Sequence, residues 1–94
     1  MSTVMSMHWP EVSKSQYEQS RKEVNWEGKA PQGAKFHVAW FGDDGLHVLD
    51  IWDSRGEFEA FVETRLMPVV RKIGVKGDPK VTFSEAHAIF APNV

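Results

Sequence analysis

Residues 36–57 have the sequence FHVAWFGDDGLHVLDIWDSRGE, and this stretch decides the fold. Two runs of alternating residues, near 35–42 and 46–53, flank a turn at Asp43-Asp44-Gly45. Alternation on both sides of an Asp-Gly turn predicts a β-hairpin. Ser54 follows the second run, and Glu57 stands at the capping-box position of a helix. The stretch therefore predicts a hairpin that leads directly into a helix.

The helix after Ser54 has the cleanest apolar stripe in the chain. Seven apolar residues recur there at helical spacing: Phe58, Phe61, Val62, Leu66, Val69, Val70 and Ile73. Pro68 lies inside the stripe. Because proline removes one backbone hydrogen bond and clashes with the preceding turn, we expect a kink or break near Thr64–Met67. Gly74 is expected to end the helix.

Shorter signals predict the remaining elements. Residues 4–8 alternate and are followed by a proline, which predicts a first strand. A helix is expected to run to about residue 25, with Ser13 or Ser15 as its N-cap. Residues 81–90 predict the last strand. The order β-α-β-β-α-β predicts one α+β domain over residues 1–94, with a ferredoxin-like, four-stranded antiparallel sheet of order 4-1-3-2 and both helices on one face.

Composition excludes several classes of function. The 94 residues carry a net charge of −2 with both signs mixed along the chain, so no basic patch indicates a nucleic-acid partner. No apolar run approaches membrane-spanning length, so we expect no membrane partner. The absence of cysteine excludes disulfides and thiolate catalysis. The first ten residues lack the basic and apolar regions of a signal peptide, and a cytoplasmic location is expected.

The predicted order, the stretch DIWDSRGEFEAF at residues 50–61 and the Leu66-Met67-Pro68 that follows resemble the dimeric α+β barrel superfamily. This superfamily includes antibiotic-biosynthesis-monooxygenase-like, EthD-like and stress-responsive proteins, and the resemblance covers nearly the whole chain. It implies a homodimer with a hydrophobic pocket between sheet and helices. Because such proteins include cofactor-free oxygenases, haem-degrading enzymes and isomerases, the resemblance implies an architecture and not one activity.

The alternation of strand residues predicts two unlike faces on the hairpin. The uniformly apolar set is expected to face the helices: Phe36, Val38, Trp40, Leu49 and Ile51. The mixed set is expected to face away from the helices: His37, Ala39, Phe41, Val48, Asp50 and Trp52. That face would be covered by a second copy, whose open sheet closes a barrel around a cavity. His47 lies beside the turn and is expected to reach solvent.

The outer strands are expected to add residues to both faces. Met5 and Met7 are predicted to face the helices, which sends Val4, Ser6 and His8 to the cavity side. On the last strand, Ala86 and Ala88 are predicted to lie under a helix, which sends Phe83, Glu85, His87 and Ile89 inward. The opposite orientation of the last strand is left open.

The catalytic prediction rests on His37, Asp50 and His87, which the strand directions gather at one end of the sheet. A carboxylate beside an imidazole holds one ring tautomer, which suits a general base acting on an acidic C–H or a phenol. The competing interpretation is a cross-strand polar pair with a structural role only.

Three further residues are predicted to bind the ligand. Trp52 has the position of an aromatic wall that stacks a ring, with Phe41 and His8 farther along the pocket. Packing at the dimer core is the alternative for Trp52.

No metal or other cofactor is expected. Two histidines and a carboxylate match the ligand set of non-haem iron, but here they come from three strands without a local spacing motif. No histidine lies on the second helix, where haem-degrading relatives place their iron ligand.

Three functions remain open from the sequence. The first is a cofactor-independent oxygenase or isomerase acting on an aromatic or polyketide-like molecule. The second is a non-catalytic ligand-binding or stress-associated dimer with the same pocket. The third is a structural homodimer whose interior is fully packed.

Overall fold

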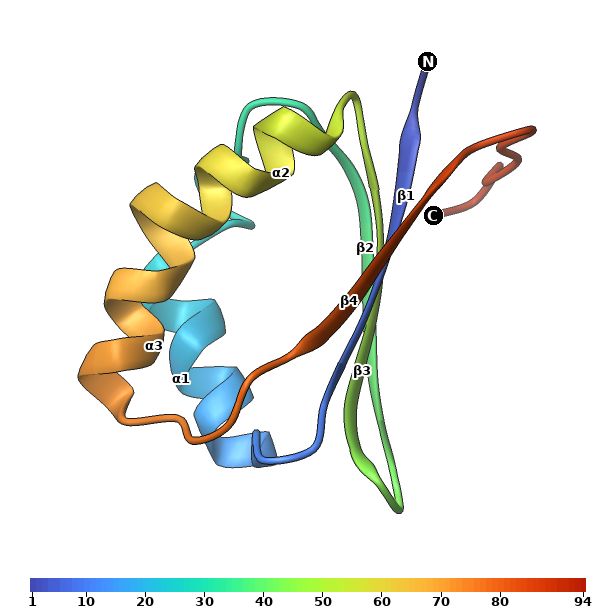
Figure 1. Cartoon of the computed structure of the whole chain (residues 1–94). Coiled ribbons are helices and arrows are strands. Elements are labelled where there is room, and N and C mark those ends of the chain that lie inside the picture. The colour runs from blue at the N-terminus through green and yellow to red at the C-terminus, as the bar shows by residue number, and fades with distance from the viewer.

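The computed structural model describes residues 1–94 and contains a four-stranded sheet with a layer of helices on one side (Figure 1). In chain order the elements are β1 (Thr3–Trp9), α1 (Lys14–Val24), β2 (Ala34–Gly42), β3 (Gly45–Trp52), α2 (Arg55–Phe61), a π-helical segment (Val62–Leu66), α3 (Met67–Ile73) and β4 (Lys80–Glu85). The predicted β-α-β-β-α-β order is confirmed, with the second helix divided into α2, the π-helical segment and α3.

The sheet is antiparallel throughout, and its strands lie in the order β2-β3-β1-β4. This is the predicted order 4-1-3-2 and confirms the ferredoxin-like class. Two pairings in the register position the side chains discussed below: His37 lies opposite Asp50, and His8 lies opposite His47. A bulge between Ala34 and Phe36 interrupts the β2–β3 ladder at the end far from the hairpin turn.

Local capping explains where the helices begin and end. Ser13 Oγ accepts a hydrogen bond from the Gln16 amide, and the Gln16 side chain accepts one from the Ser13 amide, which completes a capping box. Ser54 Oγ caps α2 by accepting from the Glu57 amide, but it donates its own proton to Glu57 Oε1, so the Glu57 side chain does not close a capping box on the Ser54 amide. Gly74 ends α3 in the left-handed conformation at φ 82°, as its sequence position predicted.

The break before Pro68 is also confirmed. The chain widens into a π-helical turn over Val62–Leu66, and the Met67 amide donates to the Val62 carbonyl, five residues back. Thr64 Oγ1 donates to the Ala60 carbonyl within the same stretch. Because Pro68 has no amide hydrogen, the helix cannot continue its regular ladder through this position, and a wider turn absorbs the mismatch.

The hairpin faces are opposite to the prediction. Val48, Asp50 and Trp52 are buried beneath the helices, whereas Val38 is 38% exposed and Trp40 is 49% exposed on the uncovered face. The apolar set therefore faces away from the helices, and the mixed set faces them. The prediction failed because it assigned the uniformly apolar set to the core. The mixed set is compatible with burial because its polar members bond to one another.

The outer strands confirm one expectation and overturn another. Met5 and Met7 are buried against the helices as predicted. Phe83, predicted to face away, packs on Phe58 with ring centroids 5.7 Å apart, so β4 has the orientation that was left open. β4 ends at Glu85, and the residues after it are not covered by a helix.

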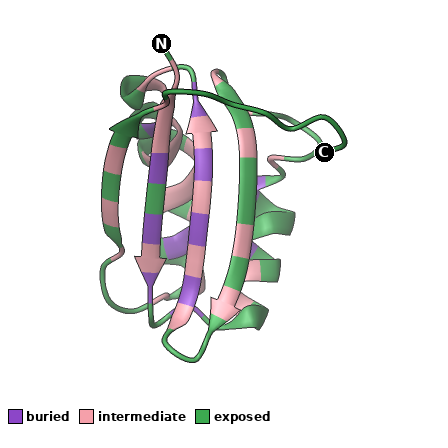
Figure 2. Cartoon of the chain, turned by 90° about the vertical axis from the view of Figure 1, so that its right-hand side faces the viewer, coloured by how far each residue is buried: buried purple, intermediate pink, exposed green.

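The hydrophobic core lies between the two layers. It contains Met5, Met7, Trp9, Val12, Leu46, Val48, Trp52, Phe58 and Val70. Figure 2 looks onto the uncovered face of the sheet, where the buried residues belong to the central strands β1 and β3. The segment after β4 extends away from the sheet on this uncovered side (Figures 1 and 2). None of the helices is both long and apolar enough to cross a membrane.

Candidate functional site

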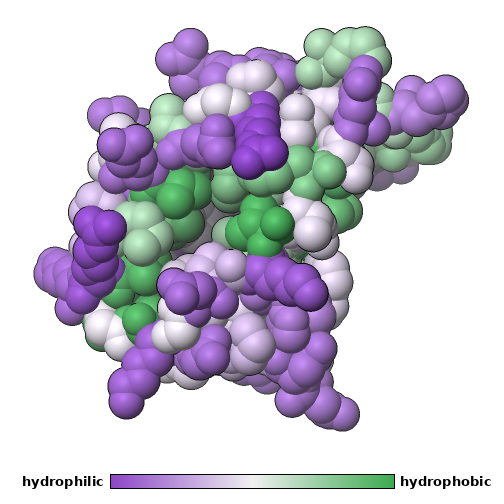
Figure 3. All heavy atoms as spheres, in the orientation of Figure 1, coloured by the Kyte–Doolittle hydropathy of each residue, from purple (hydrophilic) through white to green (hydrophobic).

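A cavity of about 270 Å³ lies between the helix layer and the sheet. Most of its lining is apolar, with walls from Met5, Trp9, Trp52, Phe58, Phe61 and Val70. On the face seen in Figure 3, apolar side chains gather between the helices and the sheet, and polar side chains surround them. A largely apolar cavity with a few polar groups is the usual form of a small-molecule site.

Four side chains form a continuous hydrogen-bonded chain at this cavity. His37 Nδ1 lies 2.6 Å from Asp50 Oδ1, and Trp52 Nε1 donates to Asp50 Oδ2 at 3.0 Å. On the other side of the imidazole, Tyr17 Oη lies 2.8 Å from His37 Nε2. With Asp50 ionised and His37 neutral, Nδ1–H donates to Asp50 and Nε2 accepts from the Tyr17 hydroxyl, so every donor in the chain has an acceptor.

Burial fixes the roles of Asp50 and Tyr17 in this chain. Asp50 is only 6% exposed, and a buried carboxylate is tolerated because both of its oxygens accept a hydrogen bond. Burial also raises the pKa of the Tyr17 phenol from 10.0 to about 12, an effect that the nearby Arg21 partly offsets. Tyr17 is therefore a neutral hydrogen-bond donor at physiological pH, and it holds His37 Nε2 in the acceptor state.

The polar chain lies at the mouth of the cavity. Tyr17, Trp26, Glu27 and His37 line the cavity and also line a groove on the outside, between α1 and β2. The Trp26 ring packs against His37 at a centroid distance of 5.2 Å and against Tyr17 at 5.8 Å. Any molecule that enters from this groove must pass these rings, so His37 is placed where a ligand would meet it.

The sequence missed two members of this group. Neither Tyr17 nor Trp26 was among the predicted site residues. The sequence did contain a hint that Tyr17 belongs to a polar site. It is the only tyrosine of the chain, it carries a hydroxyl at the end of its ring, and it lies on a helix that must pack on the sheet. Nothing in the sequence placed that tip opposite His37, since the two residues are 20 positions apart.

The predicted site residues separate into two groups. His37, Asp50 and Trp52 come together, while Phe41 lines the outer groove and packs edge-on against Tyr17 at 6.1 Å. His37, Asp50 and Trp52 line the intrachain cavity and do not face the uncovered side of the sheet. The prediction placed these residues on the side of the sheet opposite to the one they occupy.

His87 and His8 are not brought to this group. His87 follows β4, at the opposite edge of the sheet from the β2 strand that carries His37, and it is exposed. The strand was expected to extend through His87, but β4 ends at Glu85. His8 faces the uncovered side, as predicted, but this side does not line the cavity, and His8 contacts Asp44 and His47 instead.

No family model matches this chain, and no curated protein matches it. Solved structures do match. A protein of unknown function from Nitrosomonas europaea superposes with a TM-score of 0.65 at 12% identity, over 99% of this chain and 95% of that one. A putative antibiotic biosynthesis monooxygenase from the same organism gives 0.62 at 9% identity, over 94% and 100%. This chain has the ferredoxin-like fold of antibiotic-biosynthesis-monooxygenase-like proteins.

A third match has a ligand bound. A monooxygenase of Streptomyces coelicolor in complex with the ligand nanaomycin D superposes with a TM-score of 0.59 at 16% identity, over 98% of this chain and 92% of that one. Likeness at this level of identity shows the fold alone. The resemblance inferred from residues 50–68 is thus confirmed as an architecture, and the activity has to be argued from the site.

Proposed function

We propose that this protein binds a small aromatic or polyketide-like molecule in the cavity and removes an acidic proton from it, as a cofactor-independent monooxygenase or an isomerase. The observation that carries the proposal is the Tyr17–His37–Asp50 chain at the mouth of an otherwise apolar cavity. An imidazole oriented by a carboxylate is the usual general base, and aromatic walls suit a flat ligand.

The proton transfer would use His37 Nε2. A ligand phenol or acidic C–H displaces the Tyr17 hydroxyl from this nitrogen and gives it the proton, and Asp50 stabilises the imidazolium that forms. In an isomerase, His37 returns the proton to a different ligand atom. In a monooxygenase, dioxygen oxidises the ligand anion: a CH₂ carbon of the ligand becomes C=O with one oxygen atom, and the other oxygen atom leaves as water with the two hydrogens that carbon has lost.

The similar monooxygenase of Streptomyces coelicolor supports the choice of ligand class. Nanaomycin D is the ligand of that protein, and it is relevant here only because the two chains share a fold. The cavity of this chain has its own walls, in which Trp52 contacts Phe58 and Phe61 with ring centroids about 5.5 Å apart. Flat ring systems pack well between such walls.

We also propose that the protein is a homodimer that joins its uncovered sheet faces. Val38 and Trp40 are partly exposed on that face, and the interior cavity does not cover them. A contiguous apolar patch on an exposed sheet face is typical of a protein–protein interface. Sedimentation velocity of the parent and of Trp40→Glu would test this, since a charge on the joined face should yield monomers. The expected cytoplasmic location stays a prediction.

The proposed activity is tested with a panel of polycyclic phenols in air. Binding is followed by quenching of tryptophan fluorescence, and turnover by oxygen uptake and by mass spectrometry of the recovered ligand. We expect His37→Gln and Asp50→Asn to retain binding and to lose most of the turnover. His47→Gln is the matched control, because His47 lies on the other face of the same hairpin. Equal turnover in His37→Gln and the parent would refute the catalytic assignment.

A specific observation favours a non-catalytic alternative. The Tyr17 hydroxyl already occupies the acceptor nitrogen of His37, so no free base faces the cavity before the hydroxyl moves. In a binding protein, this closed chain would only hold the mouth in shape. A ligand recovered unchanged in air over a range of pH, with Tyr17→Phe altering neither its affinity nor its fate, would favour this second function.

A further inference from the structure

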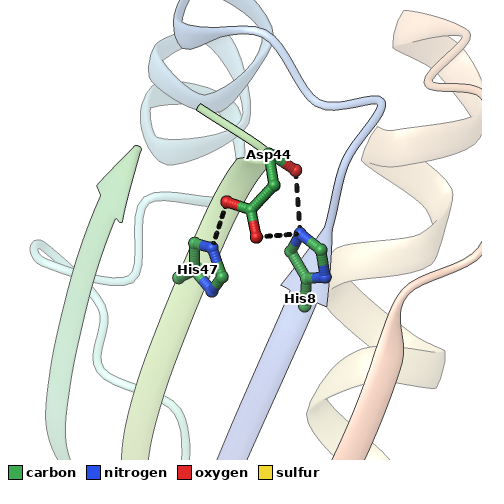
Figure 4. A group of neighbouring side chains, drawn as sticks. All are labelled: His8, Asp44 and His47. Atoms are coloured by element: carbon green, nitrogen blue, oxygen red, sulfur yellow. Dashed lines mark hydrogen bonds and ion pairs between the residues drawn. The ribbon is translucent and has the colours of Figure 1, made fainter. Parts of the chain in front are cut away.

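A second cluster of ionisable side chains lies at the tip of the hairpin, on the face of the sheet away from the cavity. It consists of His8 at the end of β1, Asp44 in the β2–β3 turn and His47 near the start of β3 (Figure 4). The potential ligand atoms of the three side chains all lie within 4.8 Å of one another. The proposed function uses none of these residues.

The two imidazoles are arranged by the strand register. His8 and His47 are direct cross-strand partners, and their rings stack with centroids 4.4 Å apart at an interplanar angle of 9°. The Trp40 ring stacks on the other face of His47 at 5.3 Å and 8°. Three parallel rings thus cross three strands, which fixes the plane in which each imidazole lies.

Both imidazoles point their Nε2 atom toward the turn. His47 Nε2 lies 2.7 Å from Asp44 Oδ1, and His8 Nε2 lies 3.5 Å from Asp44 Oδ2 and 2.8 Å from the Asp44 carbonyl (Figure 4). One carboxylate therefore bridges two imidazole nitrogens of the same kind. In this arrangement each Nε2 carries a proton that it shares with an Asp44 oxygen.

The backbone brings the turn close enough for these contacts. Gly45 has φ 104°, and a Cβ at this position would lie 2.5 Å from the Pro10 Cα and 2.7 Å from the Pro10 carbonyl oxygen. A residue with a side chain could not approach β1 so closely. Gly45 thereby allows the hairpin tip to lie against the end of β1, beside His8.

We propose that His8, Asp44 and His47 form a binding site for a divalent transition-metal ion of the zinc type. The ion would take the place of the Nε2 proton on each ring; each imidazole would exchange protons with water so that it carries its one proton on Nδ1, and its Nε2 lone pair would bind the ion. Two imidazoles and a carboxylate suit Zn²⁺, Co²⁺ or Ni²⁺, whereas Mg²⁺ and Ca²⁺ prefer oxygen ligands only. Ligand atoms bound tetrahedrally at ordinary Zn–N and Zn–O lengths lie about 3.3 Å apart. The ligand atoms lie within 4.8 Å of one another here, so binding brings them closer by up to about 1.5 Å.

The exposure of the site fits binding from solution. The side chains of His8, His47 and Asp44 are 32%, 26% and 62% exposed. In the single chain an ion can therefore enter directly, with its remaining coordination positions open to water. The three protein ligands come from one hairpin and the strand beside it, so the site does not depend on a second copy or on an occupied cavity.

The test is calorimetric titration of ZnCl₂ into tag-free, chelator-treated protein. We expect one Zn²⁺ per chain. Loss of a residue that only supports a metal ligand typically lowers metal affinity by about 10-fold to 100-fold. Loss of a ligand itself should cost at least as much, so we expect His8→Gln and His47→Gln each to bind Zn²⁺ at least ~10-fold more weakly. His87→Gln is the matched control, because His87 is an exposed histidine outside the cluster. His37→Gln should also bind normally, which separates this site from the proposed catalytic one.

A spectroscopic measurement on the parent protein keeps the test decisive if a variant fails to fold. Long-range ¹H–¹⁵N correlation spectra should show the Nε2 signals of His8 and His47 moving on addition of Zn²⁺, while those of His37 and His87 stay in place. The absence of saturable binding at millimolar Zn²⁺ would overturn the proposal. Undiminished binding in the His8→Gln/His47→Gln double variant, or binding lost in His37→Gln, would overturn it equally.

Discussion

The same pair of residue types occurs twice on one hairpin, in two different environments. His37 and Asp50 are joined at 2.6 Å beneath the helices, and His47 and Asp44 are joined at 2.7 Å at the hairpin tip. The Asp50 side chain is 9% exposed and the Asp44 side chain is 62% exposed. The bonds are alike in length, so their different consequences come from their surroundings.

Loss of the buried His37–Asp50 pair should destabilise the fold, whereas loss of the exposed His47–Asp44 pair should have little effect on stability. Water can take the place of any partner that Asp44 loses, because its carboxylate is open to solvent. Asp50 has no such substitute, and its two donors, His37 and Trp52, would themselves be left unpaired without it. The buried pair should therefore control stability and chemistry at the cavity, and the exposed cluster should respond to ions in solution.

The largest effect is expected from Asp50→Ala. Asp50→Ala leaves the His37 and Trp52 donors buried without an acceptor, and we expect the free energy of unfolding to fall by about 3 kcal/mol. Urea unfolding followed by circular dichroism measures this. Asp44→Ala is the matched control at the exposed pair, and it should shift the midpoint far less. Equal losses in the two variants would show that burial does not distinguish the pairs.

A slightly smaller effect is expected from Gly45→Ala at the hairpin tip. The new methyl group would meet the Pro10 backbone in a conformation with φ 104°, so we expect a loss of about 2 kcal/mol. Gly56→Ala is the control, because its nearest neighbour, Ser54 Oγ, lies 4.0 Å from the added Cβ and the site is helical. Thermal unfolding should show Gly56→Ala at or above the parent. A Gly45→Ala protein as stable as the parent would contradict the close approach of the tip to Pro10.

The third prediction concerns Tyr17, whose pKa burial raises to about 12. The folded state keeps this proton where the unfolded chain loses it, so stability should be fully present below about pH 10. It should fall as the pH rises from about 10 toward 12. Because the chain has one tyrosine, ultraviolet absorbance reports Tyr17 alone. A midpoint near 10 in the folded protein, equal to that in urea, would show that the phenol is not held in the chain with His37.

The smallest effect is expected at Asp44. The hydrogen bond from His47 lowers the pKa of the Asp44 carboxyl below its ordinary value. The resulting stabilisation is present at neutral pH and is lost as the pH falls through the lowered pKa, and exposure to solvent keeps it small. NMR titration of the Asp44 carboxyl in the parent and in His47→Gln measures it. An identical pKa in both proteins would mean that the bond seen here contributes nothing in solution.

Much of the fold was predictable because local signals specify it. The Asp-Gly turn, the Ser54 cap and the proline at position 68 act within a few residues, and each produced the expected hairpin, helix start or helix break. The strand order followed from the order of the elements. The pairing of His37 with Asp50 was also predictable, since it depends only on the register of one hairpin.

The side of the sheet that faces the helices was not predictable in the same way. Both faces of the hairpin carry large apolar residues, so hydrophobicity alone does not choose between them. The choice depends on whether the Asp50 carboxylate can be buried. Burial requires hydrogen bonds from His37 and Trp52, and His37 is in turn held by Tyr17, which lies 33 positions before Asp50 in the chain. The position of His87 was mistaken because β4 ends five residues before the predicted strand end.

By itself, the sequence determined the elements, their order and the His37–Asp50 pair, because turns, caps and strand register act over short stretches of chain. Only the tertiary structure decided which pair is buried and which residues complete each cluster. Tyr17 reaches His37 from another element, and His8 reaches Asp44 because a glycine lets the hairpin tip lie against β1. These contacts join residues that are distant in the chain, and packing of the whole domain is what brings them within hydrogen-bonding distance.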